Sequence, residues 1–207
     1  MPSFSIENTI STLLHKHVIV GVDEVGYGAI AGPVVSAAVF FPIRNNITQE
    51  IRDSKKLTPQ KREDLFLEII KYAQYGIGFA SVSEINQYNI LNATHLSMKR
   101  ALLNMNIKID FVLVDGNRTP NLPWEIKAIV NGDNISTSIA AASIIAKITR
   151  DKFMKALHTK YPHYYWNKNC GYGTKTHISS LHKYGKTTYH RNTFMPVSQI
   201  TRIYTET

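Results

Sequence analysis

Carboxylates follow the most apolar segments of this chain, and carboxylates grouped at strand ends can hold a metal ion. The β-branched run at residues 18–22 predicts a strand buried on both faces, and Asp23 and Glu24 follow it at once. Removing a carboxylate from water costs several kcal/mol unless a cation or strong donors compensate, so positive charge should meet these acids. The alternative is a solvated strand end, the more common environment of an Asp-Glu pair.

The same pattern returns further along the chain. A second apolar run at 111–114 ends on Asp115, and Asp133 follows a strand expected over 124–130. Two buried strands separated by helical sequence are expected to be parallel, and parallel neighbours bring their carboxyl ends to one edge of a sheet. Asp23 and Asp115 should therefore converge. Asp133 has two possible roles: it caps the helix that follows, or it is a third acid at that edge.

Asp23 and Glu24 are adjacent, and strict alternation along a strand directs neighbours to opposite faces. A site that uses both therefore requires the strand to end or to bulge there. Glycines at positions 26, 28 and 32, followed by proline, predict a tight loop in which the backbone can approach a ligand closely.

The composition of this acidic set favours a hard cation. Carboxylates without a thiol set or matched histidines select Mg²⁺ or Mn²⁺ over Zn²⁺. Cys170 is the single cysteine, which excludes an internal disulfide. Two such ions ~4 Å apart activate a water and stabilise the leaving oxygen in phosphodiester cleavage.

Hydrophobic spacing predicts the elements that position these acids. The expected strands cover 18–22, 34–41, 75–82, 111–114 and 124–130, and the expected helices cover about 59–73, 92–105 and 135–158. The last helix contains SIAAASIIAKI, whose small side chains allow close packing against a neighbour. A length of 207 residues fits a single domain over 1–207.

Overall charge indicates an anionic partner. Lys and Arg number 24 against 15 Asp and Glu, a net charge of +9, which attracts nucleic acid but also anionic membranes or acidic proteins. Residues 161–197 interleave basic and aromatic side chains, as a nucleic-acid groove does. The N-terminus lacks a secretory pattern and no run is long enough to span a bilayer, so we expect a cytoplasmic protein.

Several longer motifs resemble ribonuclease HII, in that family's order and over nearly the whole chain. They are DEVGYGAIAGPVV at 23–35, DSKKL at 53–57, VDGN at 114–117, GD at 132–133 with IAAASIIAKITRD at 139–151, GYGTKTH at 171–177 and HRNTFMPV at 190–197. The resemblance implies an α/β ribonuclease H-like fold, a mixed five-stranded sheet flanked by helices, with a helical C-terminal part from about 160. It also implies an endonuclease that cuts the RNA strand of RNA·DNA hybrids and nicks duplex DNA on the 5′ side of an embedded ribonucleotide.

The resemblance also implies roles for individual residues. The family's metal-binding acids, which take Mn²⁺ or Mg²⁺, fall on Asp23, Glu24, Asp115 and Asp133.

The family's Gly-Arg-Gly element, which senses the ribose 2′-OH through backbone groups, falls on Gly26, Tyr27 and Gly28. Here a tyrosine replaces the arginine, so we expect backbone recognition to be retained, while the cationic side chain that could contact phosphate is absent at this position. The sugar-stacking tyrosine falls on Tyr172, a residue that local sequence alone would equally allow to be a packed aromatic.

The family's phosphate-binding Ser-Lys-Lys falls on Ser54, Lys55 and Lys56, just before the helix expected at 59. Local sequence alone would favour a solvated charge run there. Thr193 stands where the family usually has serine, a mild departure.

Two alternatives remain. The type 3 enzyme has similar chemistry but carries a separate N-terminal substrate-binding domain, and only about 17 residues precede the first expected strand here. A non-catalytic RNA·DNA binding module is the other, although acids facing phosphates would weaken a pure binder. From the resemblance to ribonuclease HII we expect a monomer that binds RNA·DNA hybrids and ribonucleotide-containing duplex DNA.

Overall fold

The computed structural model describes residues 1–45, 47, 50–51, 54 and 57–204. Its backbone groups into two compact units, each described by itself. Met1–Val25, Val35–Phe79 and His95–Ile148 form the first unit, and Gly26–Val34, Ala80–Thr94 and Thr149–Thr207 form the second. The single domain expected over 1–207 stays a prediction.

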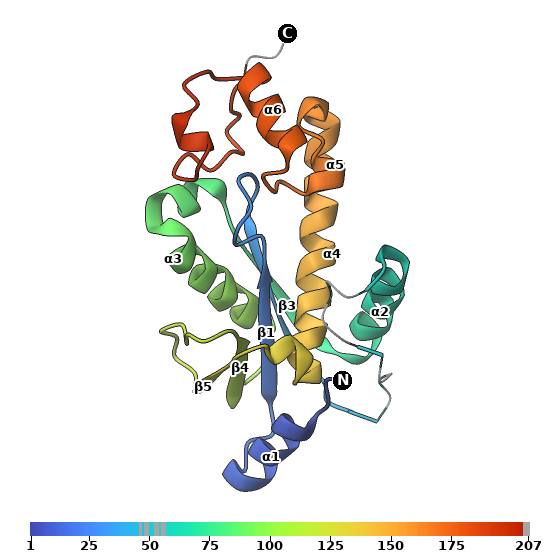
Figure 1. Ribbon diagram of the computed structural model, residues 1–207. Helices are drawn as coiled ribbons and strands as arrows, with labels where there is room; N and C mark the ends of the chain where they lie inside the picture. The colour runs from blue at the N-terminus through green and yellow to red at the C-terminus, as the bar shows by residue number, and fades with distance from the viewer. Residues whose placement is uncertain (46, 48–49, 52–53, 55–56, 205–207) are drawn as a thin grey trace. The chain divides into compact units, whose positions relative to one another are not determined.

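The strands form one mixed five-stranded sheet, as the resemblance implied. They are β1 (Ile19–Val25), β2 (Val34–Phe40), β3 (Gln74–Ala80), β4 (Phe111–Asp115) and β5 (Ile126–Ile129), in the order β3-β2-β1-β4-β5 (Figure 1). β1 pairs antiparallel with β2 and parallel with β4, and β4 pairs parallel with β5. The parallel arrangement expected for β1 and β4 is confirmed.

Six α-helices accompany these strands in the described part of the chain. They are α1 (Ser5–Leu14), α2 (Pro59–Tyr72), α3 (Val82–Leu103), α4 (Thr137–Lys160), α5 (Trp166–Asn169) and α6 (Lys175–Tyr184), with short 3-10 turns η2 (Gly132–Asn134), η3 (Pro162–Tyr164) and η4 (Val197–Gln199). α3 is interrupted at Asn89, whose φ of 65° is not helical and whose side chain accepts from the Asn92 amide at 3.1 Å. The helix expected over 92–105 is the part of α3 after this interruption.

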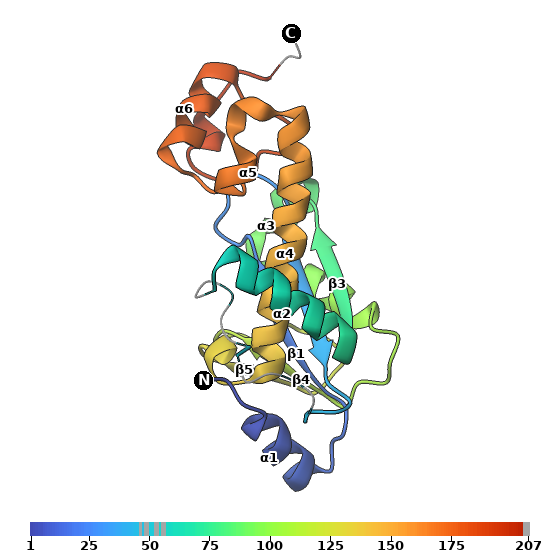
Figure 2. The same cartoon turned by 90° about the vertical axis from the view of Figure 1, so that its right-hand side faces the viewer.

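Alternation along the strands divides the core of the first unit between two faces. On one face the strands pack against the end of α3, through Val20, Val22, Val112, Val114, Met98 and Leu102. On the opposite face β2 packs against α2 and the first half of α4, through Ala37, Val39, Leu65, Ile69 and Ala141. Figure 2 shows α2 and this half of α4 in front of β1 and β4. The first unit is therefore a helix–sheet–helix sandwich.

The start of α4 lies very close to β1. A Cβ atom built on Gly21 would stand 2.3 Å from the carbonyl carbon of Ser138 and 2.4 Å from the Ile139 nitrogen. No side chain fits there, so glycine is required. The Ala- and Ser-rich start of α4 allows this approach, and the close packing expected from its composition is confirmed.

A buried glutamate from α1 holds the same helix start. Glu7 accepts hydrogen bonds from the hydroxyls of Ser136 at 2.7 Å and Ser138 at 2.6 Å, and from the Ser138 amide at 3.2 Å. Ser136 in turn accepts from the Ile139 amide at 3.2 Å, which is the contact of an N-cap residue. A negative charge at a helix N-terminus is also favoured by the helix dipole.

The second unit has an aromatic core. Tyr164 and Trp166 are fully buried and stack at 5.1 Å between ring centroids, and Met154 of α4 packs in the same cluster. The helical C-terminal part is thus confirmed, as short helices around large rings. Over the described residues, no helix combines the length and the apolar character needed to span a membrane.

Candidate active site

Strand register brings two of the predicted acids together. β1 and β4 run in parallel with Gly21 opposite Leu113 and Val22 opposite Val114, so Asp23 and Asp115 are the next pair along. The valines of these strands face α3, and alternation therefore turns both aspartates toward the face that carries α4. Asp110 supports this register, because its carboxylate accepts from the His17 and Val18 amides where β1 begins.

Asp133 completes a group of three. Asn131, with a left-handed φ of 55°, turns the chain after β5 into η2, which carries Asp133. Carboxylate oxygens of Asp23, Asp115 and Asp133 all lie within 4.8 Å of one another. The convergence expected of Asp23 and Asp115 is found, and Asp133 joins them.

Asp133 does not cap α4. Ser136 accepts from the Ile139 amide in the manner of an N-cap, whereas Asp133 accepts from its neighbour Asn134 through Nδ2 at 2.7 Å. Of the two roles open for this residue, the position in the structure favours the third acid.

The cluster gathers negative charge around the buried carboxyl group of Asp23. Asp23 is only 5% exposed, and burial raises its pKa well above the usual range, with further increases from the charges of Glu24, Asp115 and Asp133. A hydrogen bond from the Glu24 amide at 2.7 Å opposes this shift. Three converging carboxylates, two of them buried, form the oxygen-only donor set that Mg²⁺ and Mn²⁺ prefer. The residues present therefore fit a divalent cation.

Glu24 is placed differently from the three aspartates. The expectation that the strand ends or bulges at Asp23 is wrong, because β1 continues in regular register to Val25, with Asp23 opposite Ala37 and Glu24 opposite Ser36. Regular alternation directs Glu24 toward the face opposite Asp23. The strand can continue because the antiparallel partner β2 satisfies its backbone, and it ends where Gly26 adopts a φ of 95°. A metal-binding role for Glu24 stays a prediction.

The predicted substrate-binding loops meet within the second unit. The carbonyl oxygen of Gly171 accepts from the Ile30 amide at 2.9 Å and the Ala31 amide at 3.1 Å, which joins the loop after Gly28 to the loop that carries Tyr172. Tyr27 is 44% exposed. The Arg150 guanidinium lies over the Tyr172 ring, with its Cζ 5.5 Å from the ring centroid.

Ser54 faces inward. It is 3% exposed, its hydroxyl accepts from Ser143 of α4 at 2.7 Å, and its carbonyl accepts from Arg62 at 2.9 Å. A phosphate contact through this hydroxyl stays a prediction, and Lys55 and Lys56 lie outside the described residues.

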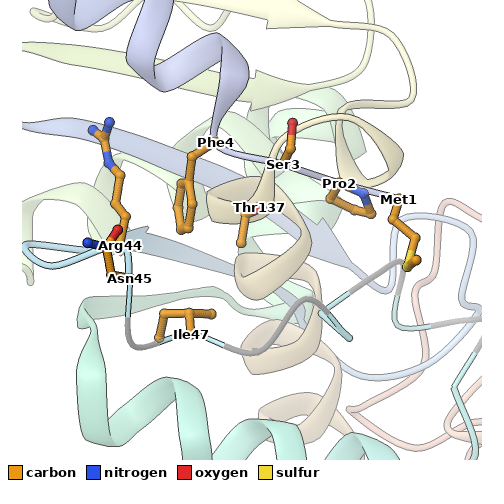
Figure 3. A pocket seen from close by; sticks show the side chains of 8 residues that line it. All are labelled: Met1, Pro2, Ser3, Phe4, Arg44, Asn45, Ile47 and Thr137. Atoms are coloured by element: carbon orange, nitrogen blue, oxygen red, sulfur yellow. The ribbon is translucent and has the colours of Figure 1, made fainter.

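A cavity of about 530 Å³ lies elsewhere in the first unit. Its walls are the segment 1–4, Thr137 at the start of α4, and Arg44, Asn45 and Ile47 (Figure 3). None of these described residues belongs to the predicted site.

Sequence reasoning did not single out two arginines that contact these substrate loops. Arg150 donates to the carbonyl of Ala31, and Arg191 donates to the carbonyl of Tyr27. A signal was present for Arg150: it continues the helical face of Ala142 and Ala146, four residues apart and both buried. A charged side chain on the buried face of a helix requires hydrogen-bond acceptors inside the protein.

Comparison with known proteins agrees with the resemblance seen in the sequence motifs. The family model described as Ribonuclease HII matches residues 20–197. The Ribonuclease HII of Ehrlichia chaffeensis is 65% identical over 207 residues, covering 99% of each chain. That of Anaplasma marginale is 62% identical over 202 residues, covering 97% of this chain and 83% of the relative.

Solved structures share the fold at lower identity. The ribonuclease HII in the PCNA:RNase HII complex of Archaeoglobus fulgidus matches with a TM-score of 0.74 and 23% identity, covering 86% of this chain and 95% of that one. Bst-RNase HIII in complex with Mn²⁺ matches with a TM-score of 0.61 and 19% identity, covering 73% of this chain and 57% of that one.

The family model and the close relatives are of type 2, which decides against the type 3 alternative. With its aspartates converged at the edge of a ribonuclease H-like sheet, the chain belongs to the ribonuclease HII family, metal-dependent endonucleases that cleave the RNA strand of RNA·DNA hybrids.

Proposed function

We propose that this ribonuclease HII also nicks duplex DNA on the 5′ side of a single embedded ribonucleotide, and so acts in ribonucleotide removal during DNA replication and repair. The observation that carries the chemistry is the triad Asp23, Asp115 and Asp133, whose oxygens lie within 4.8 Å of one another. Burial and the neighbouring acids raise the pKa of Asp23, and a bound cation would favour its ionised form.

The three aspartates would hold Mg²⁺ or Mn²⁺, with Glu24 as a proposed fourth acid. When bound, two such ions activate a water and stabilise the charge on the leaving oxygen of a phosphodiester. The finding that Bst-RNase HIII was solved with Mn²⁺ supports Mn²⁺ as one usable ion.

The chain fixes its ligands through its own backbone. Asp115 accepts from the Gly132 amide at 2.7 Å and Asp23 accepts from the Glu24 amide at 2.7 Å. Each bond uses Oδ1 and sets the plane of the carboxylate before a cation arrives. Such supporting hydrogen bonds orient metal ligands and reduce the reorganisation that binding requires.

Recognition of the ribonucleotide is proposed for Gly26, Tyr27, Gly28 and Tyr172. A backbone amide can donate to a 2′-OH whatever the side chain, so tyrosine at position 27 is compatible with this role. Stacking of Tyr172 on the following sugar would place the RNA-to-DNA junction. The net charge of +9 attracts the duplex without reading its sequence.

A labelled DNA duplex carrying one ribonucleotide tests the proposal directly. In Mg²⁺ or Mn²⁺ the protein should produce a single nick 5′ of the ribonucleotide, and EDTA should abolish it. An all-DNA duplex of the same sequence is the control. Cleavage of a long hybrid without nicking of this substrate would restrict the enzyme to hybrids, and binding without cleavage in either metal would favour the RNA·DNA binding module.

A further inference from the structure

Two arginines are completely buried in the second unit. Arg150, near the middle of α4, and Arg191, after the last histidine of the chain, each show 0% exposure. Arginine is rarely buried unless its donors are satisfied, because desolvating the charge is costly. Burial and the charge of Arg150 lower the pKa of Arg191 to about 9, so it remains charged at neutral pH. All three guanidinium nitrogens of Arg150 donate to main-chain carbonyls, as do Nε and Nη1 of Arg191, while Nη2 of Arg191 has no hydrogen-bond partner among the described residues.

Arg191 binds the loop that contains Tyr27 through hydrogen bonds to its main-chain carbonyls. Its Nη1 donates to the Tyr27 carbonyl at 3.0 Å and its Nε donates to the Gly32 carbonyl at 3.0 Å. Its own backbone amide donates to the Ile30 carbonyl at 2.9 Å. Three carbonyls of one short loop are therefore fixed by a single residue.

Arg150 forms hydrogen bonds both to the C-terminal end of this loop and to the loop that carries Tyr172. It donates to the carbonyls of Pro33 at 2.9 Å, Ala31 at 2.9 Å and Cys170 at 2.7 Å. Its guanidinium also faces the Tyr172 ring. Lysine could not reproduce either set of contacts, because only the guanidinium offers a planar fork of five donors.

The hydrogen bond from Arg191 to the Tyr27 carbonyl also fixes the direction of the Gly28 N–H. In a trans peptide the carbonyl and the following N–H point to opposite sides. Because the Tyr27 carbonyl accepts from Arg191, the Gly28 N–H of the same peptide points away from Arg191. Gly28 is exposed, and a Cβ atom built there would meet nothing within 4 Å. A ligand therefore has room to approach the backbone at Gly28.

We propose that Arg191 is a positioning residue for ribose recognition: by holding the Tyr27 carbonyl it presents the Gly28 amide to the 2′-OH, while Arg150 holds the Tyr172 loop against the same segment. This inference rests on the proposed nicking function. In this proposal Arg191 acts through the backbone at Tyr27 and Gly28, and Arg150 acts through the loop that carries the Tyr172 ring.

The test compares affinities in the Asp115→Asn background, which prevents cleavage. Fluorescence anisotropy in Mg²⁺ measures binding to a duplex with one ribonucleotide and to the matched all-DNA duplex. In Arg191→Lys the preference for the ribonucleotide should fall by about tenfold, the effect of misplacing one hydrogen bond, while all-DNA binding stays unchanged. Arg202→Lys is the matched control, since Arg202 is exposed and also donates to a main-chain carbonyl, that of Lys183.

A merely structural role for Arg191 gives a different result. Loss of folded protein lowers both affinities by the same factor, and an unchanged preference in a folded variant overturns the proposal.

If Arg191→Lys does not fold, the unaltered protein supplies the test. With EDTA present, the ¹⁵N–¹H signal of Gly28 should shift on addition of the ribonucleotide duplex and not of the all-DNA duplex. Equal response to both overturns the proposal. Failure of the wild-type enzyme to nick would instead overturn the proposed function, so the two failures are distinguishable.

Discussion

At the scale of single residues, each aspartate of the triad already uses Oδ1 for a donor in the chain. The donors are the Glu24 amide for Asp23, the Gly132 amide for Asp115, and the Asn134 side chain for Asp133. An asparagine retains an oxygen that can accept the same hydrogen bond. Asp→Asn variants therefore remove charge and metal affinity while leaving the local geometry in place.

Asp23→Asn should abolish cleavage and stabilise the metal-free protein. Because the folded pKa of Asp23 is raised, ionised Asp23 disfavours the folded state, and this penalty grows as pH rises from about 3.8 through the folded pKa. The variant should lack this penalty. Urea unfolding in EDTA from pH 5 to 8 measures it, with activity in Mg²⁺ or Mn²⁺ assayed in parallel. Either wild-type activity in the variant or a less stable metal-free variant would contradict the assignment.

Asp133→Asn should leave stability nearly unchanged and lose most activity. The start of α4 depends on Ser136 and Glu7, so removing this charge does not uncap the helix. Neutral asparagine binds a hard dication poorly. Thermal unfolding and nicking assays on the same preparation separate the two effects. A loss of activity that matches the loss of folded protein would return Asp133 to a structural role.

At the scale of elements, hydrophobic spacing predicted most strands and the long helices because their faces are buried in regular alternation. It placed the end of β1 too early, since apolar character stops at Val22 while β2 continues to pair through Val25. The helical segment before Asn89 was not expected. The roles of Arg150 and Arg191 depend on carbonyls more than 100 residues away, which no local pattern contains.

Gly21→Ala should destabilise the protein by about 3 kcal/mol or more. The added methyl would overlap backbone atoms of Ser138 and Ile139, which cannot move without displacing the start of α4. Chemical denaturation measures the change. Gly28→Ala is a control for stability, since nothing lies within 4 Å of its Cβ position. Equal stability of the two variants would show that α4 can move away from β1 at little cost.

A neutral histidine pair links the C-terminal elements and predicts a pH effect. Trp166 donates to Nε2 of His177 at 3.0 Å, and the Thr187 amide donates to Nδ1 of His190 at 3.0 Å, so both nitrogens must be unprotonated. Burial, then the charges of His177 and Lys186, lowers the pKa of His190 to about 3, and burial lowers that of His177.

The sign follows from linkage. Between pH 6.5 and about 3, His190 is protonated in the unfolded state but stays neutral in the folded state. Protonation therefore stabilises the unfolded state, and the free energy of unfolding falls as the pH drops from 6.5 to about 3. The loss is at most ~1.4 kcal/mol per pH unit. Unfolding free energies from pH 4.5 to 7 should show a flatter slope in His190→Asn than in wild type. Parallel slopes would show that His190 titrates normally in the folded protein.

At the scale of the whole molecule, the net charge of +9 attracts the phosphates of a duplex, whereas recognition of the ribose is the role we propose for the loops of the second unit. Attraction to phosphates carries no information about sugar identity. Position 27, where Tyr27 replaces the family's arginine, offers a way to change the attraction to phosphates without changing recognition of the ribose. The Tyr27 side chain is 44% exposed, but its carbonyl is held by Arg191.

Tyr27→Arg should therefore raise affinity for duplex substrates at low salt and leave the cleavage position unchanged. If the added guanidinium reaches one phosphate, the slope of log affinity against log salt concentration should steepen by about 0.9. Anisotropy titrations from 50 to 200 mM salt, on the ribonucleotide duplex and its all-DNA counterpart, should show the same steepening for both. Tyr27→Lys should behave alike, since a point charge suffices for phosphate. A moved nick, or steepening only with the ribonucleotide, would mean that the side chain at position 27 takes part in reading the junction. In that case backbone orientation by Arg191 would not be sufficient for ribose recognition.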